Sequence, residues 1–123
     1  MTEAARIKLH QAVLEILAWL NKPEANEDGV PSAWIPGGLL MQFLDGTDRR
    51  FGFRSWGPMH ASDRRRELFA ACRFLGRQGN IVFYPPTRAS RWHVALPNSR
   101  SAADERYAKC LRDAANEELT FRG

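Results

Sequence analysis

Residues 68–84 read LFAACRFLGRQGNIVFY and contain the change from a helical to an extended pattern. Four apolar residues in the first part recur at the spacing of one helix face: Leu68, Ala71, Cys72 and Leu75. Gly79 is a typical residue just past a helix end. The β-branched and aromatic residues 81–84 then favour a strand. We therefore predict a helix that begins near Ser62, which can cap it, and runs to about Gln78 before the strand.

The predicted strand continues into a hairpin. Residues 85–90, PPTRAS, have the composition of a turn. In residues 92–96, WHVAL, a bulky apolar side chain recurs at every second position, as in a strand with one buried face. The two strands are therefore expected to pair.

Two more helices are predicted before this unit. The first is capped by Thr2 and ends at residues 21–23, NKP, because proline cannot continue a helix. Its apolar stripe consists of Leu9, Val13, Ile16, Leu17 and Leu20. Residues 30–35 suit a short extended segment that prolines restrict to a sheet edge. A short helix is then expected from Pro36, in its first turn, to Leu44.

After the hairpin, a final helix is expected over residues 101–119. Ser101 and Asp104 resemble a capping box. The predicted inner face of this helix consists of Tyr107, Cys110, Leu111, Ala114 and Leu119. The predicted fold is mainly α with a small β-hairpin (α+β), in the order helix, extended piece, helix, helix, hairpin, helix. We expect residues 1–123 to form one domain with a long insertion at 45–61.

With this order of elements, the chain resembles a winged helix-turn-helix domain. The residues that carry the resemblance are the run 68–81, LFAACRFLGRQGNI, and the hairpin that ends at Leu96. The likeness is topological and covers most of residues 5–97. The chain departs from the family between its second and third helices, where about seventeen residues replace a short turn. The resemblance implies that the third helix enters the major groove of duplex DNA.

The charge of the chain is strongly polarised. Residues 47–100 contain eleven arginines, no lysine and three acidic residues, so this segment carries a formal charge of +8. The rest of the chain carries −4, which gives the overall charge of +4. Because a guanidinium offers a planar fork of donors to phosphate oxygens, a dense arginine field favours a polyanionic partner. A solvated basic face without a partner is the alternative.

The predicted third helix carries arginines opposite its apolar face. Arg66, Arg73 and Arg77 fall within one stripe, and the small Ala70 between them would let a partner approach closely. The resemblance implies that these arginines contact base edges or phosphates. The alternative is a stripe that only faces solvent, as on any amphipathic helix.

Four further arginines flank this stripe in the predicted fold. Arg64 and Arg65 occupy the first turn of the third helix, where the helix dipole disfavours cations, and this placement favours a binding role. Arg88 and Arg91 bracket the hairpin tip, which would suit contacts with a phosphate backbone. An ordinary polar turn is the alternative for the tip.

Residues 49–56, RRFGFRSW, interleave basic and aromatic side chains. Arg49, Arg50, Arg54 and Trp56 are candidate contacts, because single strands are held by ring stacking and a positive groove. Alternatively, the aromatic residues anchor a long loop onto the core. A hot spot for a protein partner is a third interpretation.

The sequence predicts no catalytic, metal or cofactor site, and we expect no enzymatic activity. His10, His60 and His93 lie on different elements without the spacing of metal ligands. No phosphate-binding glycine loop and no nucleophile elbow occurs. Cys72 and Cys110 lie on apolar faces of predicted helices and are expected to be reduced thiols, as is typical of a cytoplasmic protein, with a buried disulfide as the alternative. We expect neither a secretory signal nor a membrane helix.

Three functions are compatible with these patterns. The first is binding of duplex DNA by a small transcription or replication regulator. The second is a protein-interaction, adaptor or inhibitor module, of the kind that phages and plasmids encode, whose basic face meets an acidic or nucleic-acid-binding protein. The third is binding of RNA or single strands through residues 49–56. The terminal helices could also form a homodimer through Leu111, Leu119 and Phe121.

Overall fold

The computed structural model describes residues 1–21, 34–46, 51–97 and 100–122, the last segment with the side chains of residues 104, 105 and 107–116. In chain order, its elements are α1 (Glu3–Leu20), β1 (Ile35–Pro36), α2 (Gly37–Leu44), α3 (Ala61–Arg77), β2 (Val82–Tyr84), β3 (His93–Ala95) and α4 (Arg100–Arg122). The predicted α+β class and the predicted order of elements are confirmed.

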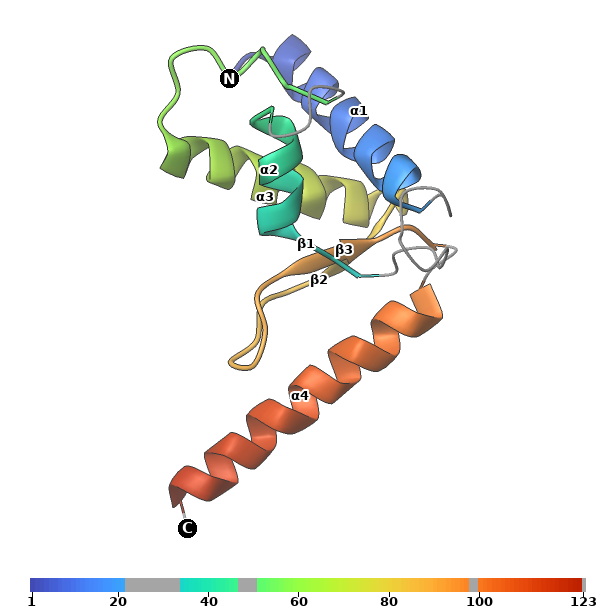
Figure 1. The fold of residues 1–123 in the computed structure, drawn as a ribbon, viewed down its shortest axis with the longest axis vertical. Helices are drawn as coiled ribbons and strands as arrows, with labels where there is room; N and C mark the ends of the chain where they lie inside the picture. The colour runs from blue at the N-terminus through green and yellow to red at the C-terminus, as the bar shows by residue number, and fades with distance from the viewer. Residues whose placement is uncertain (22–33, 47–50, 98–99, 123) are drawn as a thin grey trace.

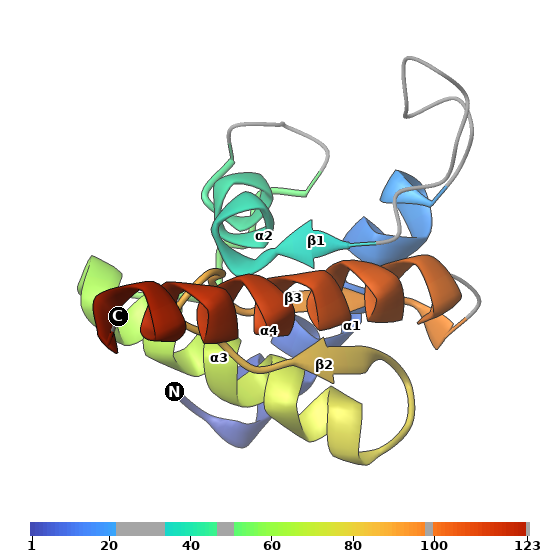
Figure 2. The same ribbon diagram turned by 90° about the horizontal axis from the view of Figure 1, so that it is seen from below.

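The three strands form one antiparallel sheet in the order β1-β3-β2. Val94 in the central strand pairs with Phe83 on β2 and with Ile35 on β1. Pro36 therefore lies on an edge strand, where its missing N–H does not interrupt the ladder. Helices α1, α2 and α3 lie on one side of the sheet, and α4 lies on the other (Figure 1 and Figure 2).

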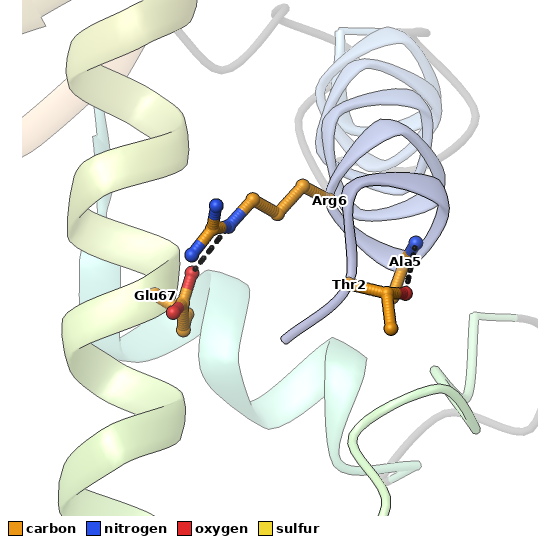
Figure 3. A network of polar contacts seen from close by, with 4 residues as sticks. All are labelled: Thr2, Ala5, Arg6 and Glu67. Atoms are coloured by element: carbon orange, nitrogen blue, oxygen red, sulfur yellow. Dashed lines mark hydrogen bonds and ion pairs between the residues drawn. The ribbon is translucent and has the colours of Figure 1, made fainter.

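The main core lies between the sheet and the first three helices. The predicted stripe of α1 is buried along its whole length, from Leu9 to Leu20. Thr2 caps this helix as predicted, because its Oγ1 accepts a hydrogen bond from the Ala5 N–H at 3.2 Å (Figure 3). Apolar burial on this scale is the dominant stabilising term of a small domain.

A smaller apolar cluster covers the opposite face of the sheet. Because side chains alternate along a strand, Tyr84 and Ala95 are directed away from the main core, and Trp34 and Tyr107 pack on them. The Tyr84 hydroxyl donates a hydrogen bond of 2.7 Å to Oδ1 of Asp104. Helix α4 is therefore attached near its N-terminal end, and its C-terminal half extends beyond the sheet (Figure 1).

The predicted inner face of α4 is only partly correct. Tyr107, Cys110 and Ala114 are half-buried, whereas Leu111 is 48% exposed, because the helix docks mainly through its first turns. Leu119 lies outside the described side chains, as does Phe121. The homodimer seam therefore stays a prediction, with an exposed Leu111 as its described member.

We expect Tyr84→Phe to weaken the docking of α4 by about 1 kcal/mol, because it removes one hydrogen bond and leaves the ring packing intact. Hydrogen exchange at the α4 amides should become about five-fold faster. In an Asp104→Ala background, the same substitution should have a clearly smaller effect. Equal effects in the two backgrounds would contradict a coupling between the two side chains.

Three predicted helix boundaries need correction, the first being that of α4, which spans Arg100–Arg122 and not residues 101–119. Helix α3 begins at Ala61 and its cap residue is His60, so Ser62 lies in the first turn and not at the cap. Pro36 precedes α2 in an extended conformation, because it also belongs to β1, and is not part of the first turn. Gly79 follows α3 with φ of 78°, which agrees with its predicted role as the helix stop.

Both cysteines are free thiols. Cys72 is fully buried in the core, as predicted, whereas Cys110 on α4 is half-buried. Burial raises the pKa of the Cys72 thiol to about 12, because the thiolate would lose its hydration. Cys72 is therefore a packing residue and a poor nucleophile.

We expect the buried Cys72 to make the free energy of unfolding decrease between pH 8 and pH 10. The thiol ionises near 9.0 in an unfolded chain and near 12 in the folded one, so the unfolded chain loses this proton first. The contribution of Cys72 to the free energy of unfolding is complete below pH 9 and is lost as the pH rises toward 12. At pH 10 the loss amounts to about 1.4 kcal/mol. Urea titrations of the parent and of Cys72→Ala at both pH values measure it. A decline of the same size in the variant would contradict this assignment.

Candidate nucleic-acid interface

Helix α3 has one buried apolar face and one exposed basic face, as the sequence predicts. The buried residues are Leu68, Ala71, Cys72 and Leu75. On the opposite side, Arg66, Arg73 and Arg77 are exposed, and so is Ala70 between them. We call these three arginines the α3 arginine row. The described part of the long loop, residues 51–60, leaves this row open to solvent.

Contacts within the protein engage the α3 arginine row only weakly. Nη1 of Arg66 lies 3.8 Å from Oδ1 of Asp63, but the Arg66 side chain is 80% exposed, and such a pair contributes little. The guanidinium of Arg73 lies 5.8 Å from the ring centroid of Phe69. Among the described residues, no carboxylate forms an ion pair with Arg73 or Arg77. Arg73 and Arg77 therefore present positive charge that no described carboxylate neutralises, and the exposed Arg66 adds to it.

The first turn of α3 holds an arginine that serves the fold. Nε of Arg64 donates a hydrogen bond of 3.0 Å to the Met59 carbonyl, and its Nη1 lies 3.6 Å from Oδ1 of Asp45. Its guanidinium also lies 6.0 Å from the ring centroid of Trp56. The prediction that Arg64 contacts nucleic acid stays a prediction, although these groups within the protein already engage its side chain.

Arg65 has different surroundings. A hollow of about 240 Å³ lies where α2, α3 and the hairpin meet, and Arg65 lines it together with Arg91 and Trp92. Both arginines are exposed, and neither forms an ion pair with a carboxylate of the described residues. The two predicted contact elements thus place one arginine each beside the same hollow.

The hairpin rests directly on α3. The rings of Phe69, Phe83 and Trp92 form a cluster with centroid separations of 5.5 to 5.7 Å. Gly76 lets β2 approach the helix backbone, because a Cβ at this position would lie 3.0 Å from Cβ of Phe83. Sequence patterns predict these residues as members of a helix and two strands, but they do not predict the ring cluster.

The hairpin tip is a hydrogen-bonded turn. The Thr87 N–H donates to the Ser90 carbonyl at 2.7 Å, and the Ala89 N–H donates to Oγ1 of Thr87 at 3.2 Å. Arg88 and Arg91 are exposed at this turn. The tip therefore carries two arginines on a defined backbone.

The structure describes only some of the residues between α2 and α3 that were predicted to contact nucleic acid. Arg49 and Arg50 lie outside the described residues, and Arg54 is exposed. Trp56 is only 5% exposed, and its ring packs edge-on against Phe53 with centroids 4.9 Å apart. The prediction that Trp56 contacts nucleic acid is therefore wrong. The structure supports the alternative in which the aromatic residues anchor the loop onto the core.

No family model, no curated protein sequence and no solved structure matches this chain. None of the helices in the described part combines the length and the apolar composition that a membrane span requires. Within the same residues, no group of three or more His, Cys, Asp or Glu side chains could hold a metal ion. The arginine geometry is therefore the main guide to function.

A groove between α1 and α3, beside the α3 arginine row, was not predicted. It exposes two large apolar side chains, Ile7 at 51% and Phe74 at 45%. The His10 ring stacks on Phe74 with ring centroids 4.8 Å apart, and partial burial lowers the pKa of His10. Arg6 reaches across from α1 to Glu67 on α3 at 3.6 Å (Figure 3). The sequence signal that could have indicated this groove is an aromatic residue, Phe74, next to the arginine stripe of the predicted third helix.

Proposed function

We propose that this protein binds duplex DNA as a winged-helix protein and acts as a small transcription or replication regulator. The order of elements supports the winged-helix assignment, because a hairpin follows α3 directly and pairs with the short strand before α2. In this proposal α3 enters the major groove, which is wide enough for a helix, and the hairpin tip lies over the phosphate backbone.

The meeting of Arg65 and Arg91 at one hollow is the observation that carries the proposal. One residue comes from the proposed groove helix and the other from the proposed wing. Like charges that line one hollow repel each other, and no carboxylate of the described residues forms an ion pair with either arginine. A polyanion that spans both elements would relieve this repulsion. The α3 arginine row and Arg88 extend the same positive surface.

A fluorescence anisotropy titration at two salt concentrations tests the proposal. Random duplex, single strand and heparin are compared at about 50 and 200 mM salt. If six arginines each contact one phosphate, raising the salt from about 50 to 200 mM should lower the duplex affinity by about 10³-fold. These six are Arg65, Arg66, Arg73, Arg77, Arg88 and Arg91. Duplex should bind more tightly than single strand. An affinity that does not change with salt would reject the proposal.

A second function, a protein-interaction or inhibitor module, is favoured by the groove between α1 and α3. Ile7 and Phe74 expose apolar surface next to arginines, and aromatic and arginine side chains dominate protein-binding hot spots. This function predicts stoichiometric capture of one protein, loss of that capture in Phe74→Asp, and no retention of the parent on random duplex. Tight duplex binding without any captured protein would reject it.

A further inference from the structure

The hollow between α2, α3 and the hairpin has an apolar floor as well as a charged rim. Met41, Leu68, Pro86 and Trp92 supply its apolar lining, and Gly37 and Gly38 at the start of α2 complete it. Leu68 is buried, whereas Arg65 and Arg91, which line the same hollow, are exposed.

The floor of the hollow is preorganised by Trp92. Its ring packs against both Phe69 and Phe83 and lies against Gly37, whose N–H donates a hydrogen bond of 3.3 Å to the Trp92 carbonyl. Gly38, in contrast, has open space beside it, because a Cβ at this position would meet no atom within 4 Å. Because Gly38 has no side chain, a ligand that enters the hollow at this position displaces none.

We propose that this hollow binds a small organic carboxylate with an apolar body. A volume of about 240 Å³ holds about eight water-sized groups, so the ligand has roughly the size of a ring that bears one carboxylate. The two guanidiniums match a carboxylate, and the first turn of α2 adds the positive end of a helix dipole. An inorganic phosphate or a DNA backbone would leave the apolar floor unfilled, and a neutral ligand would leave the arginines unpaired.

Benzoate is the probe, and nuclear magnetic resonance on the full chain is the measurement. Benzoate should shift the Gly38 amide and the Trp92 indole signals with a dissociation constant of the order of 1 mM. Benzamide lacks the charge and acetate lacks the ring, so each should bind at least about ten-fold more weakly. No shift at about 20 mM benzoate, or equal binding of either analogue, would overturn the proposal.

Substitutions at the hollow provide the second test. Gly38→Leu adds a bulky side chain at a lining position where a Cβ meets no atom within 4 Å, and it should abolish the benzoate response while both arginines remain. Arg65→Gln and Arg91→Gln should each weaken benzoate binding by about ten-fold. Arg112→Gln, an exposed site on α4, is the matched control and should bind benzoate like the parent. Unchanged affinity in Gly38→Leu would place the ligand elsewhere and overturn the proposal.

Occupation of the hollow should also compete with duplex, and this part rests on the proposed function. Benzoate at ten times its dissociation constant should lower duplex affinity by about ten-fold, because it engages Arg65 and Arg91. Sodium acetate at the same concentration is the ionic control, and Gly38→Leu should not respond to benzoate. A parent protein that binds no duplex would reject the proposed function, while the resonance shifts still decide the hollow itself. If benzoate left the duplex affinity unchanged, the proposal that benzoate and duplex bind the same two arginines would be overturned.

Discussion

Gly37→Ala is expected to lower the free energy of unfolding by about 3 kcal/mol, the upper end of the range for overpacked sites. The added Cβ would lie 2.1 Å from Cζ2 and 2.3 Å from Cε2 of Trp92, far inside van der Waals contact. Trp92 cannot move aside easily, because its ring also packs against Phe69 and Phe83. Urea unfolding followed by circular dichroism measures the change.

Gly38→Ala is the matched control for this prediction. It adds the same methyl group one residue later, where a Cβ meets no atom within 4 Å. Alanine favours a helix over glycine, so this variant should be more stable than the parent by up to about 1 kcal/mol. If both alanines changed stability alike, the close contact between Gly37 and Trp92 would not be the cause.

The double substitution Arg73→Ala/Arg77→Ala is expected to lower duplex affinity by about 100-fold or more at 0.1 M salt. Each arginine that contacts a base edge or phosphate should contribute about 1–3 kcal/mol. Loss of two phosphate contacts should also reduce the slope of log affinity against log salt by about 1.8. Anisotropy titrations of the parent and the variant measure both quantities.

A control variant with the same change in net charge shows whether lost contacts or the lower overall charge reduce the duplex affinity. Lys109 and Arg112 are exposed on α4, which lies on the other side of the sheet from α3 (Figure 2). Lys109→Ala/Arg112→Ala should therefore bind duplex within about three-fold of the parent. If this control lost as much affinity as the α3 variant, overall charge and not the α3 arginine row would explain the binding.

The features that local spacing determines could be predicted from the sequence. The stripe of α1 and the two faces of α3 follow from helical periodicity, and they appear where the spacing places them. The Thr2 cap and the Gly79 stop depend on the chemistry of a few neighbouring residues and are also present. The α4 face was predicted less well, because Leu111 has the right spacing but no element of the described structure buries it.

The parts of the candidate site that depend on distant residues could not be predicted. Arg64 differs from Arg65 because Asp45 and Trp56 lie beside it, and both come from outside α3. Spacing alone gives no reason to separate two adjacent arginines. The hollow at Arg65 and Arg91 likewise exists only once the hairpin has packed on α3.

The small residue at position 76 has a mechanical consequence. Because β2 touches the α3 backbone there, with Phe83 Cβ only 3.0 Å from where a side chain would begin, the two elements have little room to slide past each other. We expect helix and hairpin to tilt together as one rigid body. In the proposed duplex complex, the points that contact the helix and the hairpin would then have to lie a set distance apart, so the protein would distinguish molecules of equal charge by their shape.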